Sequence, residues 1–268
     1  MLVCSLGDLT LDVIVRLAGP IAPGGDTDAE IRLTAGGQAA NVSAWAAELG
    51  ATARFIGKRG ADDAARLALA GLAAQGVEVV GPSEGRNGIV CSLVSADGER
   101  SMAADRGAAA DLRPEEIDRE WLEGCDHLFV SGYALMREPA RSAAARAVEL
   151  ARGEGAQVSV DLASWSAIRD VGAAEFRDVV TDLAPHVVFA NEDEERVVGG
   201  PFPGVTWILK RRERGCSFDG VERPALPVTR IVDPTGAGDA LAAGWIVGGP
   251  DLALEAAARC VQQMGTMP

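Results

Sequence analysis

The strongest constraint on the fold is the alternation of short apolar runs with alanine-rich stretches in the C-terminal half of the chain. The β-branched, apolar runs have the length of strands buried on both faces, and they occupy residues 127–133, 157–163, 186–192 and 206–210. Residues 138–155 between the first two runs fit a helix with Pro139 in its first turn and Gly153 and Gly155 at its end. This alternation predicts an α/β fold with a mostly parallel sheet and helices on both faces.

The N-terminal half is less regular. Residues 2–6 read as a strand that ends in a turn at Gly7, and residues 36–50 read as a helix. Residues 12–34 and 88–105 do not fit the strand–helix alternation and resemble β-hairpins, the second with its turn at Asp97-Gly98. These two hairpins predict a small sheet standing apart from a main domain.

Size and charge limit the function classes. The 268 residues, 48% of them hydrophobic, fit one large domain spanning residues 1–268. The net charge of −14 argues against a nucleic-acid-binding surface, although a few backbone N–H groups could still hold a small anion. No run approaches a membrane span, and residues 1–15 lack the basic start of a signal peptide. We therefore expect a cytoplasmic protein with no membrane partner.

The metal-binding residue types are sparse. The five cysteines are widely spaced and contain no C-x-x-C pair, so reduced thiols are expected rather than a disulfide or zinc framework. His127 and His186 lie far apart in the sequence and are interpreted as structural or surface residues.

One glycine-rich stretch points to chemistry. Residues 228–232 read as a strand and residues 240–247 as a helix, with Gly236-Ala237-Gly238 between them. The first N–H groups of a helix lack intrahelical partners, and small residues let an anion approach them, with Asp239 beside it as a potential base. A dinucleotide fingerprint fails because Leu241 stands in the third glycine position, and no P-loop is present. A plain helix start with a dipole-favouring aspartate remains the alternative.

Several ordered motifs together resemble the ribokinase-like (PfkB) carbohydrate kinases. The family pattern D-x-T-G-A-G-D-x-F-x-x-G is matched from Asp233 to Gly244, with Leu241 in place of Phe. Weaker matches come earlier in the chain: Gly7 and Asp12, Gly36-Gly37 with Asn41, Gly57, Gly60 and Asp62, and Asn191 with Glu194. The resemblance covers nearly the whole chain and implies a three-layer ribokinase-like fold.

The resemblance also implies roles for individual residues. Asp239 would be the catalytic base, and the N–H groups of Gly236, Ala237 and Gly238 would form the anion hole. Substrate hydroxyls would be held by Asp12, Gly36, Gly37 and Asn41. Nucleotide binding would fall to Asn191, Glu194, Lys210, Gly215 and Thr235 together with Gly236 and Gly238. Glu194 would act on a metal ion indirectly.

The expected activity is ATP-dependent phosphorylation of a hydroxyl on a sugar or sugar-like substrate. The cofactors implied are ATP and Mg²⁺, with a monovalent cation such as K⁺ as a further candidate. The two hairpins would form a lid over the sugar, and this lid is a candidate surface for a homodimer. A nucleoside kinase of the same fold and a non-catalytic sugar sensor remain open alternatives.

The chain departs from the family pattern in three places. Arg212 replaces the first glycine of L-x-x-G-x-x-G, so it either contacts phosphate or crowds it. Residues 100–112 lack an Asn that many members have, and Arg106 there has two open interpretations, a substrate or phosphate contact and a surface residue. The chain is also shorter than most members, which predicts abbreviated segments near the adenine.

Overall fold

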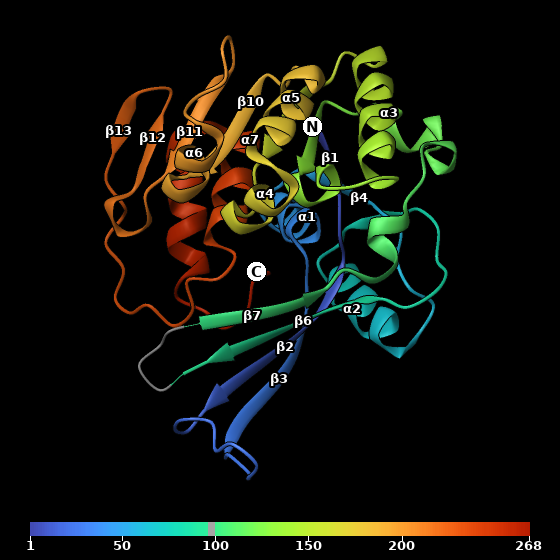
Figure 1. Ribbon diagram of the computed structural model, residues 1–268. Coiled ribbons are helices and arrows are strands. Elements are labelled where there is room, and N and C mark those ends of the chain that lie inside the picture. The colour runs from blue at the N-terminus through green and yellow to red at the C-terminus, as the bar shows by residue number, and fades with distance from the viewer. Residues whose placement is uncertain (96–99) are drawn as a thin grey trace.

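Two sheets organise the protein, a large one within the main body and a small one beside it (Figure 1). The computed structural model describes residues 1–95 and 100–268. The large sheet has nine strands in the order β13-β12-β11-β10-β9-β8-β1-β4-β5. Its strands from β11 to β5 pair in parallel, and β12 and β13 add an antiparallel edge. The predicted α/β class with a mostly parallel sheet is confirmed.

The strands of the large sheet are short, as expected for strands covered on both faces. They are β1 (Leu2–Leu6), β4 (Thr52–Ile56), β5 (Glu78–Val80), β8 (His127–Ser131), β9 (Gln157–Asp161), β10 (Val187–Asn191), β11 (Thr206–Lys210), β12 (Cys216–Phe218) and β13 (Val221–Arg223). The helices are α1 (Gln38–Glu48), α2 (Asp63–Ala74), α3 (Ala140–Gly153), α4 (Trp165–Val171), α5 (Ala173–Leu183), α6 (Glu192–Val198) and α7 (Ala237–Cys260). Helix α7 is interrupted at Gly249, which is followed by Pro250.

Each face of the large sheet has its own apolar core. On β8 the side chains of Leu128 and Val130 join the core beneath α3, α4 and α5, while Phe129 joins the core beneath α1, α2 and α7. This division follows the two-residue period of a strand, which sends successive side chains to opposite faces. Alanines fill much of the buried surface of α1 and α3, which lets these helices lie close to the sheet. The result is the predicted helix–sheet–helix layering.

The small sheet joins both predicted hairpins. Its strands are β2 (Thr10–Leu17), β3 (Ala29–Gly36), β6 (Gly88–Val94) and β7 (Arg100–Asp105), in the order β3-β2-β6-β7. The pairs β2–β3 and β6–β7 are antiparallel, whereas β2 pairs with β6 in parallel and so connects the two hairpins. The predicted turn at Asp97-Gly98 lies outside the described residues. Figure 1 shows this sheet extending away from the body of the molecule.

One strand prediction is wrong. Residues 228–232 form no strand, and they run beside the end of α7, where Val232 N donates to Val261 O. Ile231 is exposed, so the apolar pattern of this segment does not reflect burial in a sheet. The edge position is taken instead by the β12–β13 hairpin, which the sequence reading missed because each strand has only three residues.

Within residues 1–95 and 100–268, no helix is both long enough and apolar enough to cross a membrane. The five cysteines, Cys4, Cys91, Cys125, Cys216 and Cys260, are all unbridged.

The core facing α7 provides a test of the fold. Phe189 on β10 is fully buried and meets Trp245 of α7 edge-to-face, with 5.8 Å between ring centroids. Phe189→Ala leaves a cavity there, so we expect the free energy of unfolding to fall by about 3–5 kcal/mol in chemical denaturation. The control Val221→Ala, on a side chain that is 61% exposed, should change it by less than about 0.5 kcal/mol. Equal effects of the two substitutions would contradict this packing.

Candidate active site

The carboxyl ends of the parallel strands bring together residues from distant parts of the sequence. Asp8 follows β1, Tyr133 follows β8, and Asp161, Asn191 and Lys210 end β9, β10 and β11. Because the parallel strands all run in the same direction, these side chains lie together at the carboxyl end of the sheet. Open α/β sheets bind their ligands at this end. The small sheet lies at the same end, because β2 begins three residues after Gly7 and β3 leads directly into α1. The start of α7 lies there too, since Asn41 of α1 donates to Asp239.

The N-terminus of α7 offers N–H donors. Gly236 caps the helix with a φ of 78°, a conformation that favours glycine, and a Cβ there would lie 2.9 Å from Thr266. Gly238 faces Lys210, whose Nζ would be 3.3 Å from a Cβ at that position. Within the described chain, no backbone acceptor pairs with the N–H groups of Gly236, Gly238 or Asp239, whereas Ala237 N donates to Pro234 O at 3.4 Å. The helix start is therefore open to an anion.

Asp239 is held in place by α1. Asn41 Nδ2 donates to Asp239 Oδ2 at 2.8 Å, and Thr266 Oγ1 donates to Asn41 Oδ1 at 2.8 Å, which fixes the orientation of the amide. No hydrogen bond from the described residues reaches Asp239 Oδ1, and the side chain stays partly exposed. Desolvation raises the pKa of Asp239 to about 7. The carboxylates of Asp161 and Asp8 add to this rise, while Asn41 and Lys210 oppose it.

The pKa of Asp239 suits a group that exchanges a proton near neutral pH. A carboxylate with an ordinary pKa is a weak base, whereas one that titrates near 7 can accept a proton from a positioned hydroxyl and release it again. The geometry therefore places a carboxylate of raised pKa in the first turn of a helix whose N-terminus is open.

The residues predicted to hold a substrate lie next to this base. Asp12 on β2 is buried and accepts a hydrogen bond from Thr10 Oγ1 at 2.7 Å. Gly36 and Gly37 are required by close packing, since a Cβ on Gly36 would lie 2.2 Å from the Asp12 carboxylate and one on Gly37 would lie 2.3 Å from Asp8 O. The structure thus brings Asp12, both glycines and Asn41 to one corner of the site.

A buried ion pair lies on the other side of Asp239. Lys210 Nζ donates to Asp161 Oδ2 at 2.6 Å. Burial alone would lower the pKa of Lys210, but the negative charges of Asp161 and Glu194 raise it above its usual value. Lys210 therefore stays positively charged next to the helix start at Gly238. The family resemblance points to Lys210 but not to Asp161, which ends an apolar strand with no motif around it.

Asn191 and Glu194 form a capping box at the start of α6. Asn191 Oδ1 accepts from the backbone N–H groups of Asp193 and Glu194, and the Glu194 carboxylate accepts from Asn191 N at 2.8 Å and Nδ2 at 2.7 Å. Glu194 is 1% exposed, and burial is the main cause that raises its pKa to about 7. Each of its two oxygens accepts a hydrogen bond from Asn191. Glu192, Asp193 and Glu195 occupy the first turn of α6, as a solvated acidic helix start would.

The described residues contain no cluster of three or more His, Cys, Asp or Glu side chains suited to holding a metal ion. The same edge fits a polyphosphate, because Lys210 and the α7 N-terminus both present positive charge to it.

Arg212, at the position of a family glycine, keeps the backbone conformation that glycine would supply, with a φ of 54°. Its exposed guanidinium reaches Asp193 at 3.4 Å. It lines a cavity of about 220 Å³ beside Asn191 and Lys210. Gly215 has a φ of 94°, and a Cβ there would lie 2.1 Å from Arg223 O. Thr235 donates from its backbone N to Asp233 Oδ1 at 2.9 Å, which shapes the loop before α7.

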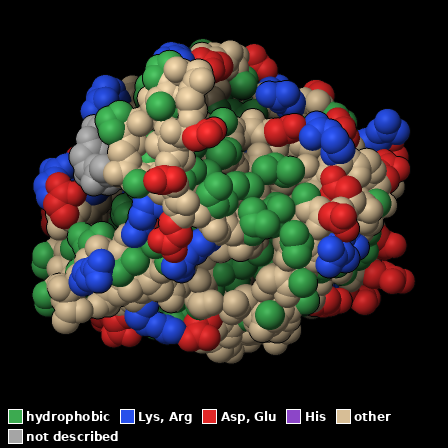
Figure 2. All heavy atoms as spheres, turned by 90° about the horizontal axis from the view of Figure 1, so that it is seen from below, with side chains coloured by type: hydrophobic (Ala, Val, Ile, Leu, Met, Phe, Trp, Pro, Cys, Tyr) green, Lys and Arg blue, Asp and Glu red, His purple; other side chains and the backbone are tan. Residues whose placement is uncertain are grey.

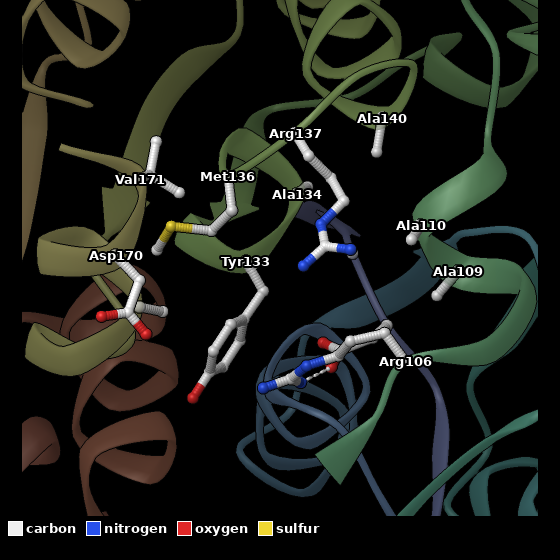
Figure 3. A pocket seen from close by; sticks show the side chains of 13 residues that line it. Arg106, Ala109, Ala110, Tyr133, Ala134, Met136, Arg137, Ala140, Asp170 and Val171 are labelled. Atoms are coloured by element: carbon white, nitrogen blue, oxygen red, sulfur yellow. Dashed lines mark hydrogen bonds and ion pairs between the residues drawn. The ribbon is translucent and has the colours of Figure 1, made fainter. Parts of the chain in front are cut away.

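A second group of side chains lines a cavity of about 270 Å³ next to the carboxyl end of β1 (Figure 3). Arg106 donates to Asp8 Oδ2 at 2.5 Å, and its guanidinium carbon lies 3.5 Å from the centroid of the Tyr133 ring. Arg106 is therefore part of a cavity wall, which decides between its two interpretations against a surface role. Asp8 and Tyr133 were missed as site residues because only the strand topology brings them together.

Comparisons with known proteins identify the family of this chain. The family model for pfkB family carbohydrate kinases matches residues 1–201. An ATP-dependent ribose-1-phosphate kinase from Halopiger xanaduensis is 32% identical over 281 residues, covering 96% of this chain and 90% of that relative. Fructokinase-1 from Oryza sativa subsp. japonica is 28% identical, covering 89% of this chain and 80% of the relative.

Solved structures share the fold. Adenosine kinase from Sinorhizobium meliloti superposes with a TM-score of 0.87 at 23% identity, covering 99% of this chain and 95% of the other. A putative ribokinase II from E. coli in complex with ATP and Mg²⁺ gives a TM-score of 0.84 at 22% identity, covering 99% and 94% of the two chains. The family model spans 201 of the 268 residues and the ribose-1-phosphate kinase from H. xanaduensis is similar along almost its whole length, so this chain belongs to the pfkB family of carbohydrate kinases.

Proposed function

We propose that the protein transfers the γ-phosphoryl group of Mg²⁺–ATP to a hydroxyl of a sugar or sugar phosphate, with Asp239 as the base. The observation that carries this proposal is the position of Asp239, a carboxylate whose pKa is raised to about 7 in the first turn of a helix whose N–H groups are open. A protein that only sensed sugars would gain nothing from a carboxylate poised in this way. The intact site therefore favours an enzyme over a non-catalytic relative.

The side chains divide the work of the reaction. Asp239 Oδ1 accepts the proton of the attacking hydroxyl, while Asn41 keeps Oδ2 in place. The N–H groups of Gly236 and Gly238 donate to the oxygens on which charge accumulates during transfer. Lys210, held by Asp161, adds a fixed positive charge beside them. Asp12 and Asn41 orient the hydroxyls of the acceptor.

Mg²⁺–ATP, when bound, supplies the phosphoryl group with part of its charge already neutralised. The residues that would hold it are Lys210, Arg212, Gly215, Thr235 and the start of α7, with Asn191 and Glu194 fixing the adjacent loop. The exposed guanidinium of Arg212 supports a phosphate contact rather than crowding.

We propose that the small sheet acts as a lid and as the contact between two copies of the chain. Its hydrophobic side chains at Ile31, Leu33 and Met102 are more than half exposed. Figure 2, which views the molecule from the side of the small sheet, shows hydrophobic side chains gathered across the middle of this face. We also propose a cytoplasmic location, which the five unbridged cysteines support.

Replacing the base tests the proposal directly. Asp239→Asn keeps the size and the hydrogen bond to Asn41 but removes proton acceptance, so we expect kcat to fall about 10²- to 10⁴-fold in an assay of ADP release. Asp251→Asn, on an exposed carboxylate of the same helix, should retain full activity. Undiminished turnover in Asp239→Asn would refute the role of this carboxylate.

The raised pKa of Asp239 predicts the pH dependence of activity. The base must be ionised to accept a proton, so kcat/KM for the acceptor should rise with pH up to a plateau that begins somewhat above pH 7. The pH–rate profile of Asp251→Asn should coincide with that of the wild type. A profile that levels off below pH 5, or an inflection near 7 that persists in Asp239→Asn, would contradict this assignment.

The same pKa predicts a cost in stability. Because the pKa of Asp239 is raised in the folded protein, the folded state binds this proton more tightly than the unfolded state does between about pH 4 and pH 7, and stability falls as the pH rises through that window. Asp239→Asn removes this loss, so at pH 8 we expect a higher melting temperature than that of the wild type, with the difference shrinking toward pH 4. A melting temperature below that of the wild type at pH 8 would show that the carboxylate stabilises the fold.

A further inference from the structure

The cavity of about 270 Å³ beside β1 lies next to the proposed reaction centre. Asp8, in its wall, raises the pKa of Asp239, and Asp239 in turn raises the pKa of Tyr133 in the same wall. Helix α1 joins the two places, since Asp8 lies against Gly37 just before this helix and Asn41 within it donates to Asp239 Oδ2 at 2.8 Å. The opposite side of the cavity is formed by Met136, Arg137 and Ala140, at the turn that leads into α3.

One oxygen of the buried Asp8 carboxylate accepts no hydrogen bond from the described residues, which supports the cavity as a binding site. The side chain of Asp8 is 3% exposed, its Oδ2 accepts from Arg106, and its Oδ1 has no hydrogen-bond partner within the described residues. Leaving a buried carboxylate oxygen unpaired is costly, so a ligand hydroxyl that donates to it would be favoured. The cavity therefore suits a molecule that carries hydroxyl groups.

Arg137 adds an exposed positive charge to the wall of the cavity. Figure 3 shows its guanidinium projecting into the cavity from the side opposite Asp170. Among residues 1–95 and 100–268, no carboxylate forms an ion pair with Arg137, while Asp170 is paired with Arg169 and Asp8 with Arg106. In a chain with a net charge of −14, a cation left unpaired at a cavity points to a negatively charged ligand.

A neighbouring cavity of about 840 Å³ continues from the same side chains, since Arg106, Ala110 and Arg137 line both. Its other cations are already neutralised. Lys58 pairs with Glu84 and Glu116, and Arg86 pairs with Asp105. Arg106 and Arg137 both lie where the two cavities meet, and Arg106 pairs with Asp8. The guanidinium of Arg137 is therefore the positive charge available to a ligand there.

We propose that this cavity binds the phosphate group of a phosphorylated monosaccharide, and that Arg137 selects such an acceptor over the neutral sugar. The guanidinium matches two phosphate oxygens in a fork, whereas a neutral sugar offers it no charge. The hydroxyls of the sugar would reach Asp8 Oδ1 and, at the far end, Asp239. This inference rests on the proposed kinase function and narrows its acceptor to a sugar that already carries a phosphate.

The test compares matched acceptors. ADP release is measured with ribose, ribose 1-phosphate and ribose 5-phosphate, and with fructose, fructose 1-phosphate and fructose 6-phosphate. For the wild type we expect kcat/KM to be at least about 100-fold higher with a phosphate ester than with its neutral sugar. In Arg137→Gln we expect KM for that ester to rise about 10- to 100-fold while kcat changes little, because the lost contact is made equally before and during transfer.

Two further variants test whether the charge of Arg137, rather than a change in folding, sets the preference for the phosphate ester. Arg137→Lys keeps the charge but not the fork, so it should give a KM between those of the wild type and Arg137→Gln. Arg146→Gln, on an exposed arginine of α3 that lines neither cavity, should keep the wild-type preference for the ester. Unchanged melting temperatures would show that all three variants fold.

The outcomes for this inference and for the kinase function are distinct. Equal kcat/KM for neutral sugars and esters, or an ester preference that Arg137→Gln leaves intact, would overturn the inference and leave the kinase function standing. No ADP release above the Asp239→Asn background with any acceptor would contradict the kinase function instead. Calorimetric titration with each sugar phosphate then identifies the ligand of the cavity: binding that Arg137→Gln weakens about 10- to 100-fold supports the inference, and no binding to the wild type overturns it.

Discussion

Parallel pairing through the middle of the large sheet is the constraint on which the rest of the molecule depends. The register of β1 against β4 and β8, and of β10 against β9 and β11, aligns the carboxyl ends of strands that are far apart in the sequence. At that edge the chain leaves the ladder and polar side chains can face a ligand without breaking strand hydrogen bonds. The apolar cores on both faces fix this register, because a slip of one residue would move Leu128 and Phe129 to the wrong layers.

This edge gathers more negative charge than is favourable for stability. The pKa of Asp239 rises mainly because this carboxyl group is desolvated, and the negative charges of Asp161 and Asp8 add to the rise. The protein offsets part of that cost with the Lys210–Asp161 pair and with the hydrogen bond from Asn41. Desolvation destabilises the ionised form of a carboxyl group, so it raises the pKa toward the range of a base that acts near neutral pH. The same desolvation lowers the free energy of unfolding when the group is ionised.

Positive charge is distributed differently. Most arginines of this acidic chain are committed to nearby carboxylates, as Arg106 is to Asp8 and Arg86 is to Asp105. Arg137 and the start of α7 are left open at opposite ends of the site, one beside the cavity near α3 and the other beside Lys210. The anion position proposed at Arg137 and the one proposed at the start of α7 would lie on either side of the acceptor hydroxyl, an arrangement that suits a reaction in which both partners carry phosphate.

The resemblance to the PfkB family pointed to the corner formed by Asp12, Gly36, Gly37 and Asn41, and the sequence by itself determined the layer architecture and the glycine motif before Asp239. Those features come from local periodicity and from backbone conformations that glycine alone adopts easily, and both are written in short stretches of sequence. Tertiary structure decided that residues 228–232 are not a strand, because pairing depends on a partner that only the assembled sheet supplies. It also decided the roles of Asp8, Arg106, Tyr133, Arg137 and Asp161, since a charge or an unpaired oxygen gains meaning only from neighbours that chain folding brings within hydrogen-bonding distance.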